Sequence, residues 1–295
     1  MNPLLAVWYF LEYAAARALV FVLGITPLPL LLGFAELLAR VAFVVLRGRR
    51  SIAIDNLLQG RVCDSPEAAR RMAFQAFRAF TLMIIETAAA RRRMRADNWK
   101  DFVTLHVEPE AEKLLNQPET GVLVASAHIG NWEIAAHAAS TFKPICVVYR
   151  PFNNPYLDRY LHQARSGERL HLISRLDLNP MRFLQSLSAG EALALMIDQH
   201  VYNGAVQVEY FGRPAWTTKS VAMLHLTTRA PLLIAYALRT GPLRYEVHAI
   251  GPIRCTRTGD REKDAFEITQ ALTREIEKIA RRHPEQYMWG HRRWK

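Results

Sequence analysis

The 295-residue sequence has few cysteines, few acidic residues and none of the signature motifs of three large enzyme classes. Its three cysteines, Cys63, Cys146 and Cys255, do not have the spacing of a metal site. Cys146 falls within an expected strand, so we expect buried thiols in a reducing compartment. A Gly-x-Ser-x-Gly nucleophile elbow does not occur, and neither does a glycine-rich phosphate loop of the Walker or Rossmann type. These absences argue against a serine hydrolase, a P-loop enzyme and a dinucleotide-binding enzyme.

Basic residues outnumber acidic ones, with 38 Lys and Arg against 27 Asp and Glu, which gives a net charge of +11. Hydrophobic residues make up 51% of the chain and charged residues 22%, as in a globular protein with a sizeable core. The positive charge implies an anionic partner, which is nucleic acid, an anionic membrane surface or an acidic ligand.

Two long apolar stretches, residues 3–22 and 27–46, occupy the N-terminal region. No basic segment precedes them and no small-residue cleavage site follows, so a cleavable signal peptide is not expected. Each stretch is long enough to cross a bilayer, but each also carries two charges that are costly at mid-bilayer. These charges are Glu12, Arg17, Glu36 and Arg40. We expect a helical hairpin inserted partly into one leaflet, or one short span with an interfacial helix, and the alternative is two core helices of a soluble protein.

A basic cluster, Arg47-Gly48-Arg49-Arg50, follows the second apolar stretch directly. Such a cluster suits anionic lipid head groups on the cytoplasmic side of a membrane. Nucleic-acid binding is not expected, because the basic clusters flank apolar helices and chain ends and are not interleaved with aromatic platforms. The sequence therefore predicts membrane-associated helices over residues 1–50 and one catalytic α/β domain over residues 51–295.

The remaining chain has the pattern of an α/β protein. Residues 52–58 continue helically, and Ser65-Pro66-Glu67 starts a helix that runs to about Arg91. Strands and helices then alternate from Phe102 onward, which predicts a largely parallel sheet flanked by helices. The expected strands are 121–127, 145–149, 170–174, 192–198, 206–211, 232–238 and 245–250, and the expected helices are 132–140, 155–165, 180–188, 218–228 and 262–283.

The residues best suited to chemistry lie at the end of the apolar strand 121–127, in the run from Ser126 to Glu133. His128 and Glu133 lie where a strand gives way to a helix that Asn131 can cap, the usual place for chemistry in open α/β sheets. Gly130 allows a sharp turn, through which Glu133 could reach one imidazole nitrogen and leave the other free to take a proton from a hydroxyl. On the residues alone, a general base and a strand-end histidine bonded to backbone are equal alternatives.

A metal centre is not expected in this run. His137 follows Glu133 by four residues and could share its helical face. Together with His128, however, the pair forms no recognised zinc pattern.

The segment from His128 to Glu133 resembles the His-x4-Asp/Glu motif of glycerolipid-type acyltransferases. Its Gly-Asn-Trp-Glu form resembles in particular the lipid A lauroyl/myristoyl acyltransferase branch. Three further blocks agree with that branch in order along the chain: Tyr149-Arg150-Pro151 with Asn154-Pro155; Asp198-Gln199 with residues 210–215 and Thr217-Thr218; and the C-terminal run 284–295. The resemblance spans nearly the whole chain, including the N-terminal apolar region.

This resemblance implies a glycerolipid-acyltransferase-like fold and an inner-membrane enzyme with its catalytic domain on the cytoplasmic side. The enzyme would move a fatty acyl chain from acyl carrier protein, or from coenzyme A, to a hydroxyl of a lipid A-type glycolipid precursor, with no cofactor. By similarity His128 is the base and Glu133 its partner. Arg165 and Asp198 are further site residues near the acceptor phosphate or the oxyanion, although a surface ion pair and a helix cap are their alternatives. The other substrate-binding candidates are Asn131, Arg150 and Gln199.

Departures from the branch leave the acceptor open. Lys219 and Ser220 stand where a glycine is common, and His200 replaces an acidic residue. The alternatives are acylation of another glycolipid, such as a phosphatidylinositol mannoside, or of a glycerolipid, and a non-enzymatic lipid-binding protein on the same scaffold. The C-terminal candidates for contact with the carrier protein or with head groups are Arg281, Arg282, His291, Arg292, Arg293 and Lys295.

Overall fold

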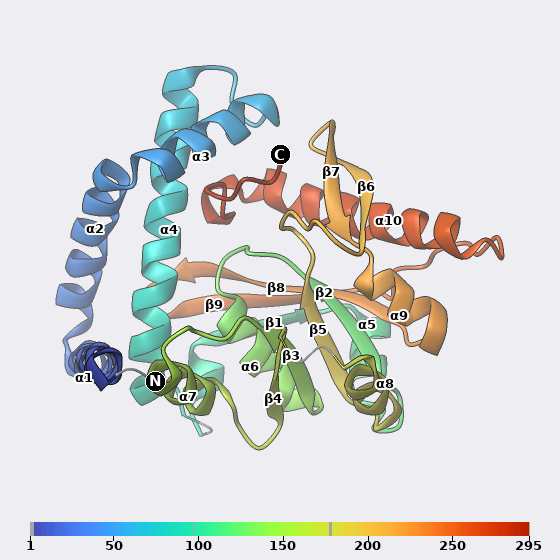
Figure 1. The fold of residues 1–295 in the computed structure, drawn as a ribbon, viewed down its shortest axis with the longest axis horizontal. Coiled ribbons are helices and arrows are strands. Elements are labelled where there is room, and N and C mark those ends of the chain that lie inside the picture. The colour runs from blue at the N-terminus through green and yellow to red at the C-terminus, as the bar shows by residue number, and fades with distance from the viewer. Residues whose placement is uncertain (1–2, 96, 177–178, 295) are drawn as a thin grey trace.

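The computed structural model describes residues 3–95, 97–176 and 179–294, and its centre is a seven-stranded sheet flanked by helices (Figure 1). The strand order is β1-β9-β8-β2-β5-β3-β4, and every neighbouring pair is parallel except the β8–β9 hairpin. The expected α/β fold with a largely parallel sheet is therefore confirmed. The strands are β1 (Val103–Val107), β2 (Val122–Ser126), β3 (Ile145–Tyr149), β4 (Leu170–Ser174), β5 (Ala192–Met196), β8 (Leu232–Gly241) and β9 (Arg244–Ile250).

Helices cover both faces of this sheet, and Figure 1 shows α9 and α10 on one side and α6 on the other. Successive side chains of a strand point to opposite faces. Accordingly, Leu123 and Ala125 of β2 pack in the main core with α8, α9 and α10, whereas Val122 and Val124 pack on the side of α5 and α6. Because β2 is buried along its whole length, it forms the centre of the fold. These helices are α5 (Pro109–Leu115), α6 (Trp132–Phe142), α8 (Pro180–Ser188), α9 (Ser220–Thr228) and α10 (Arg261–Arg282).

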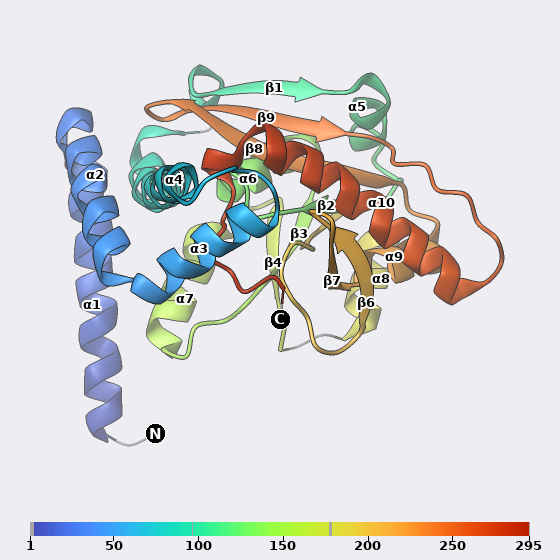
Figure 2. The same ribbon diagram turned by 90° about the horizontal axis from the view of Figure 1, so that it is seen from above.

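The N-terminal helices lie together at one side of the molecule. The long helix α4 (Pro66–Arg93) starts at Ser65, whose hydroxyl accepts the Ala68 N–H at 3.2 Å, and α1, α2 and α3 pack against it. Figures 1 and 2 both show α1 and α2 beside α4 and away from the sheet. Their bounds are α1 (Pro3–Ile25), α2 (Leu28–Val45) and α3 (Arg47–Gln59). The basic cluster is thus the first turn of α3, and the predicted domain boundary after residue 50 falls within this helix.

Most of the apolar surface of α1 and α2 is not covered by protein. Both helices are long and apolar enough to cross a membrane, and only 0% and 22% of their apolar windows, respectively, are buried. Helix α2 buries Leu31, Ala35 and Ala39, and two of these, Leu31 and Ala35, share a cluster with apolar residues of α4. The alternative of two core helices is therefore wrong for this structure.

The sequence pattern did not predict three elements, and one predicted strand lies outside the main sheet. Strand β1 and helix α5 precede the first predicted strand, and β7 (Arg213–Thr218) lies between the predicted strand 206–211 and the predicted helix 218–228, which it overlaps only at Thr218. The predicted strand 206–211 is β6 (Ala205–Tyr210), which pairs only with β7 in a separate hairpin. Pro214 obscured β7, because proline is tolerated only at an open edge, and each strand of a two-stranded hairpin has one.

Candidate active site

A tight turn between β2 and α6 presents His128 at the carboxyl end of the sheet. Gly130 has φ of +56°, and a Cβ at this position would meet the carbonyl oxygen of Ala237 at 1.8 Å. The same turn is held by two backbone bonds, from the N–H of Gly130 to the Gln286 carbonyl at 2.9 Å and from the N–H of Asn131 to the Ala237 carbonyl at 2.8 Å. The glycine is therefore required, because only glycine adopts this conformation so close to another backbone without strain.

The imidazole of His128 is held by Asp198. Its Nδ1 lies 2.9 Å from Asp198 Oδ1, and its backbone N–H donates to Oδ2 at 3.0 Å. The two residues meet because β2 and β5 are paired in parallel with Ser126 opposite Met196, and each residue lies two positions beyond that pair. A carboxylate on Nδ1 fixes the proton there and leaves Nε2 unprotonated in the neutral ring.

The Asp198 carboxylate is ionised although it is buried at 5% exposure. Burial pushes the pKa of Asp198 up, but the His128 charge and the hydrogen bonds from His128 outweigh burial, and the pKa lies below its usual value. Its place beside the imidazole also excludes the helix-cap alternative, since β6 and not a helix follows β5.

Glu133 does not contact the imidazole, contrary to the prediction from sequence. Its carboxylate receives a two-point ion pair from Arg165, with Nε donating to Oε2 at 2.8 Å and the terminal nitrogen donating to Oε1. Arg165 is the last residue of α7 (Pro155–Arg165), and Glu133 lies in the first turn of α6. The prediction is wrong because Asp198 takes Nδ1, so Glu133 instead holds Arg165 at the same cavity that His128 lines.

A narrow cavity of about 190 Å³ extends from these residues under α6. Its polar end has His128, Glu133, Arg150 and Arg165, and Trp132 packs edge-on to His128 with 4.9 Å between ring centroids. The rest is lined mainly by apolar side chains, among them Val124, Ala135, Ala136, Ala139, Ile145, Val147, Leu170, Leu172, Ala194 and Ala235. Strand β3 lines the cavity from Ile145 to Tyr149, and four steps of about 3.3 Å along a strand make the cavity about 13 Å long. Its shape suits an extended hydrocarbon chain.

Of two other predicted site residues, Gln199 lies beside His128 and Asn131 is buried behind the turn. Gln199 directs its Nε2 to within 3.4 Å of both ring nitrogens of His128 and is in position to contact a substrate. Asn131 is only 1% exposed. Its Oδ1 accepts the Ile134 N–H at 3.2 Å and its Nδ2 donates to Thr87 at 3.0 Å. Asn131 is thus a helix cap and α4 contact, and the predicted substrate contact through its side chain is wrong.

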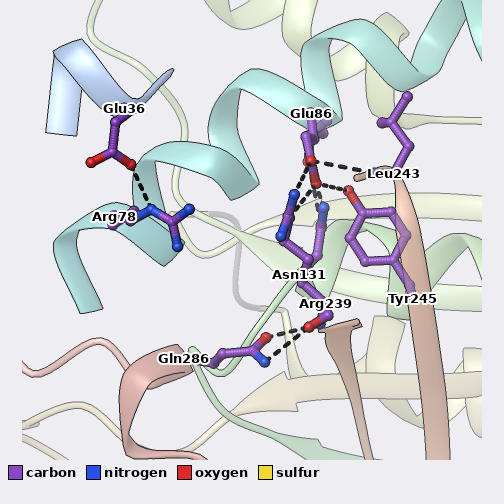
Figure 3. Close-up of polar contacts among 9 residues, drawn as sticks. Glu36, Arg78, Glu86, Asn131, Arg239, Leu243, Tyr245 and Gln286 are labelled. Carbon is purple, nitrogen blue, oxygen red and sulfur yellow. Dashed lines mark hydrogen bonds and ion pairs between the residues drawn. The ribbon is translucent and has the colours of Figure 1, made fainter. Parts of the chain in front are cut away.

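A buried polar network behind the turn escaped the sequence prediction (Figure 3). Glu86 of α4, at 0% exposure, accepts two bonds from Arg239 at 2.8 and 2.9 Å and one from the Tyr245 hydroxyl at 2.7 Å. The backbone of Arg239 in turn pairs with the side chain of Gln286, whose carbonyl holds Gly130. Burial, and then the Glu86 carboxylate, raises the pKa of Tyr245. A lone acid in the apolar run 81–90 was the available signal, since buried carboxylates need partners.

The C-terminal basic residues divide into buried and exposed ones. Arg293 is 3% exposed, donates to the Trp216 carbonyl at 2.7 Å and to Thr217, and is not available for docking. Burial lowers the pKa of His291 to about 4, so this ring is neutral. Arg292 is exposed and lines a second, larger cavity, and Lys295 lies outside the described residues.

The fold and site together define an enzyme class. A histidine fixed by a carboxylate at the carboxyl edge of the sheet, beside an apolar cavity and a half-buried ion pair, suits an enzyme that activates a hydroxyl next to a hydrocarbon chain. The family model described as bacterial lipid A biosynthesis acyltransferase matches residues 3–295. The chain therefore belongs to this family, and it is an O-acyltransferase.

Curated relatives carry corresponding names. The lipid A biosynthesis palmitoleoyltransferase of Escherichia coli (strain K12) is 25% identical over 274 residues, which cover 91% of this chain and 86% of the relative. The lipid A biosynthesis lauroyltransferase of the same strain is 27% identical over 281 residues, with coverage of 91% and 86%. The lipid A biosynthesis acyltransferase of Haemophilus influenzae is 30% identical over 261 residues, with coverage of 84% and 78%.

Proposed function

We propose that this enzyme transfers a fatty acyl chain from an acyl thioester, on acyl carrier protein or coenzyme A, to a hydroxyl of a lipid A precursor. The observation that carries the proposal is the Asp198–His128 pair at the polar end of the apolar cavity, with Nδ1 bonded and Nε2 left as the base. The family and the names of its relatives support the acceptor class.

His128 would act first as base and then as acid. Nε2 takes the proton of the acceptor hydroxyl as its oxygen attacks the thioester carbonyl. The C–S bond then breaks, and Nε2 gives this proton to the leaving sulfur, so that the donor departs as a thiol and the imidazole is neutral again. Asp198 stabilises the imidazolium between these steps and keeps the ring in the productive tautomer, as in other histidine–carboxylate pairs.

Arg165 would stabilise the negative charge that develops on the carbonyl oxygen. Glu133 engages Nε and one terminal nitrogen of Arg165, which leaves N–H donors of the other terminal nitrogen for the reaction. A half-buried guanidinium positioned in advance is a strong donor to an oxyanion or phosphate. Glu133 thus acts through Arg165, and the apolar cavity receives the donor's acyl chain.

Membrane association is supported by the exposed apolar faces of α1 and α2 and by the net charge of +11. The charges within α1 do not all face outward, because Glu12 accepts a bond from Asn154 next to α7 at 2.9 Å. We therefore place α1 and α2 in the cytoplasmic leaflet of the inner membrane, with the catalytic domain on the cytoplasmic side. The anionic surface and the acidic carrier protein would both be attracted to the basic chain.

The test is transfer of a labelled acyl chain from acyl carrier protein to a lipid A precursor by the full chain in detergent, followed by mass spectrometry. We expect His128→Ala to reduce the rate by at least about 10³-fold, because it removes the base and the acid of both steps. The control is His171→Ala, since His171 lies on β4 with an exposed side chain and lines neither cavity. Undiminished transfer by the His128 variant would overturn the mechanism, and lipid binding without turnover by any donor would favour the lipid-binding alternative.

A further inference from the structure

A second cavity, of about 1220 Å³, opens between the N-terminal helices and the C-terminal segment. It is larger than the few hundred to about 1,000 Å³ of a typical small-ligand site. It lies next to His128, because its wall includes Gln199, which contacts the His128 ring, and Phe80, which packs on Trp132 at 6.2 Å between ring centroids. Arg150 lines both this cavity and the narrow one.

The walls of this cavity are divided between apolar and basic groups. Helices α2 and α4 contribute an apolar wall that includes Leu38, Ala42, Val45, Phe77, Phe80 and Ile84. Four arginines lie around the remainder: Arg47 and Arg49 from α3, Arg150 after β3, and Arg292 near the C-terminus. All four are exposed, and none forms an ion pair with a carboxylate in the described part of the chain.

These arginines come from three distant parts of the sequence and line the same cavity. Arg49 ties two of the parts together, since it donates to the Gly290 carbonyl at 3.0 Å. Four uncompensated guanidinium groups repel one another unless an anion lies among them. Arginine is also the side chain best suited to binding phosphate, through two parallel hydrogen bonds.

We infer that this cavity is the acceptor site, and that Arg47, Arg49 and Arg292 bind a phosphate of a phosphorylated glycolipid whose acyl chains lie on the α2–α4 wall. The inference rests on the proposed function and assigns its substrate a place. The phosphate-bearing arm of a carrier protein fits less well, because the acyl chain that it carries is assigned to the narrow cavity and leaves no hydrocarbon for this apolar wall. A flat membrane surface also fits less well, because the arginines line a recess whose wall includes Gln199, a neighbour of the His128 ring.

The test compares a phosphorylated lipid A precursor with the same lipid after phosphatase treatment, using the full chain in detergent. We expect R47Q/R49Q and R292Q each to raise KM for the phosphorylated acceptor about tenfold to a hundredfold, with kcat and the donor KM within about threefold. KM for the phosphatase-treated lipid should be the same in variants and wild type. The control R274Q removes an exposed arginine of α10 that lines neither cavity, and should change neither constant.

Equilibrium binding of the radiolabelled phosphorylated lipid, without acyl donor, separates this inference from the proposed function. Binding that depends on the three arginines, in a protein that transfers no acyl chain, would support the site and reject the reaction. A raised KM for the donor alone would assign the arginines to the carrier protein, and loss of vesicle binding alone would assign them to the membrane. Either of these outcomes, or equal weakening of both acceptor lipids, would overturn the inference.

Discussion

At the scale of single residues, the site depends on which carboxylate reaches which base. Two acids compete for this role in the sequence, and the structure separates them into Asp198 on the imidazole and Glu133 on the guanidinium of Arg165. Loss of either acid would leave the imidazolium or the arginine without compensation in a half-buried site. The pairing thus gives the two acids different roles, although both lie within one cluster.

We expect Asp198→Asn to lower kcat by about 10³-fold or more. The amide has no negative charge to stabilise the imidazolium, and its NH2 group can donate to Nδ1 and so favour the wrong tautomer. The folded-state pKa of Asp198 lies below its usual value, so its contribution to stability is present above the unfolded pKa of about 3.9 and is lost as pH falls through the folded value. Because Asn does not titrate, the free energy of unfolding of the variant should fall less steeply than that of wild type as pH is lowered. Urea titrations from pH 3 to 7 and a rate assay measure both effects. Wild-type kcat in the variant would contradict the assigned pairing.

At the scale of elements, α6 forms the roof of the narrow cavity. Ala139 lies two turns beyond Trp132, about 10 Å further along the helix axis, and lines the deep part with Ile145 and Leu170. We expect Ala139→Leu to fill this part and to shift acyl-donor preference to chains shorter by about two carbons, at a cost of about 1–3 kcal/mol in stability. Competition assays with donors of several chain lengths, with thermal melting in parallel, measure the shift.

Thr141→Leu is the matched control for the cavity-filling variant, because it adds a leucine to the same helix at an exposed position outside the cavity. It should leave the donor preference unchanged. An unchanged preference in the Ala139 variant, with the protein folded, would show that the acyl chain lies elsewhere.

Local signals predicted the elements well, whereas contacts across the sheet were harder to predict. The helices 155–165 and 180–188 match α7 and α8 because Asn-Pro pairs cap their starts. Strands of apolar residues, such as β3 and β4, were equally plain. The prediction for Glu133 was wrong because it considered only a partner five residues away, His128. The observed partner, Arg165, is 32 residues away in the sequence. Strand order decides such meetings, and periodicity in one sequence does not reveal it.

At the scale of the whole molecule, one face of α2 packs against the rest of the protein and another face is exposed. Residues at helical spacing, Leu31, Ala35 and Ala39, are fully buried, whereas the stripe Leu30, Phe34, Leu37, Val41 and Val44 is 43–66% exposed. This uncovered apolar stripe beside the apolar helix α1 is the surface through which we propose that the protein contacts the membrane. The net charge of +11 would favour anionic lipid as the proposed partner, and the first turn of α3, which follows α2, contains three arginines.

We expect the double variant Leu37→Lys/Val41→Lys to bind anionic vesicles at least about tenfold more weakly than wild type, because two side chains, each with about 1.5–3 kcal/mol of burial energy, would be replaced by charges. Neither position lines a cavity described above, so acyl transfer to a lipid presented in detergent micelles should persist. Flotation with vesicles measures binding, and circular dichroism verifies folding. Thr141→Lys, which adds charge at an exposed site on α6, is the control. Because two added lysines raise the attraction to anionic lipid, weaker binding can come only from the apolar contact, and unchanged binding would remove α2 from the membrane.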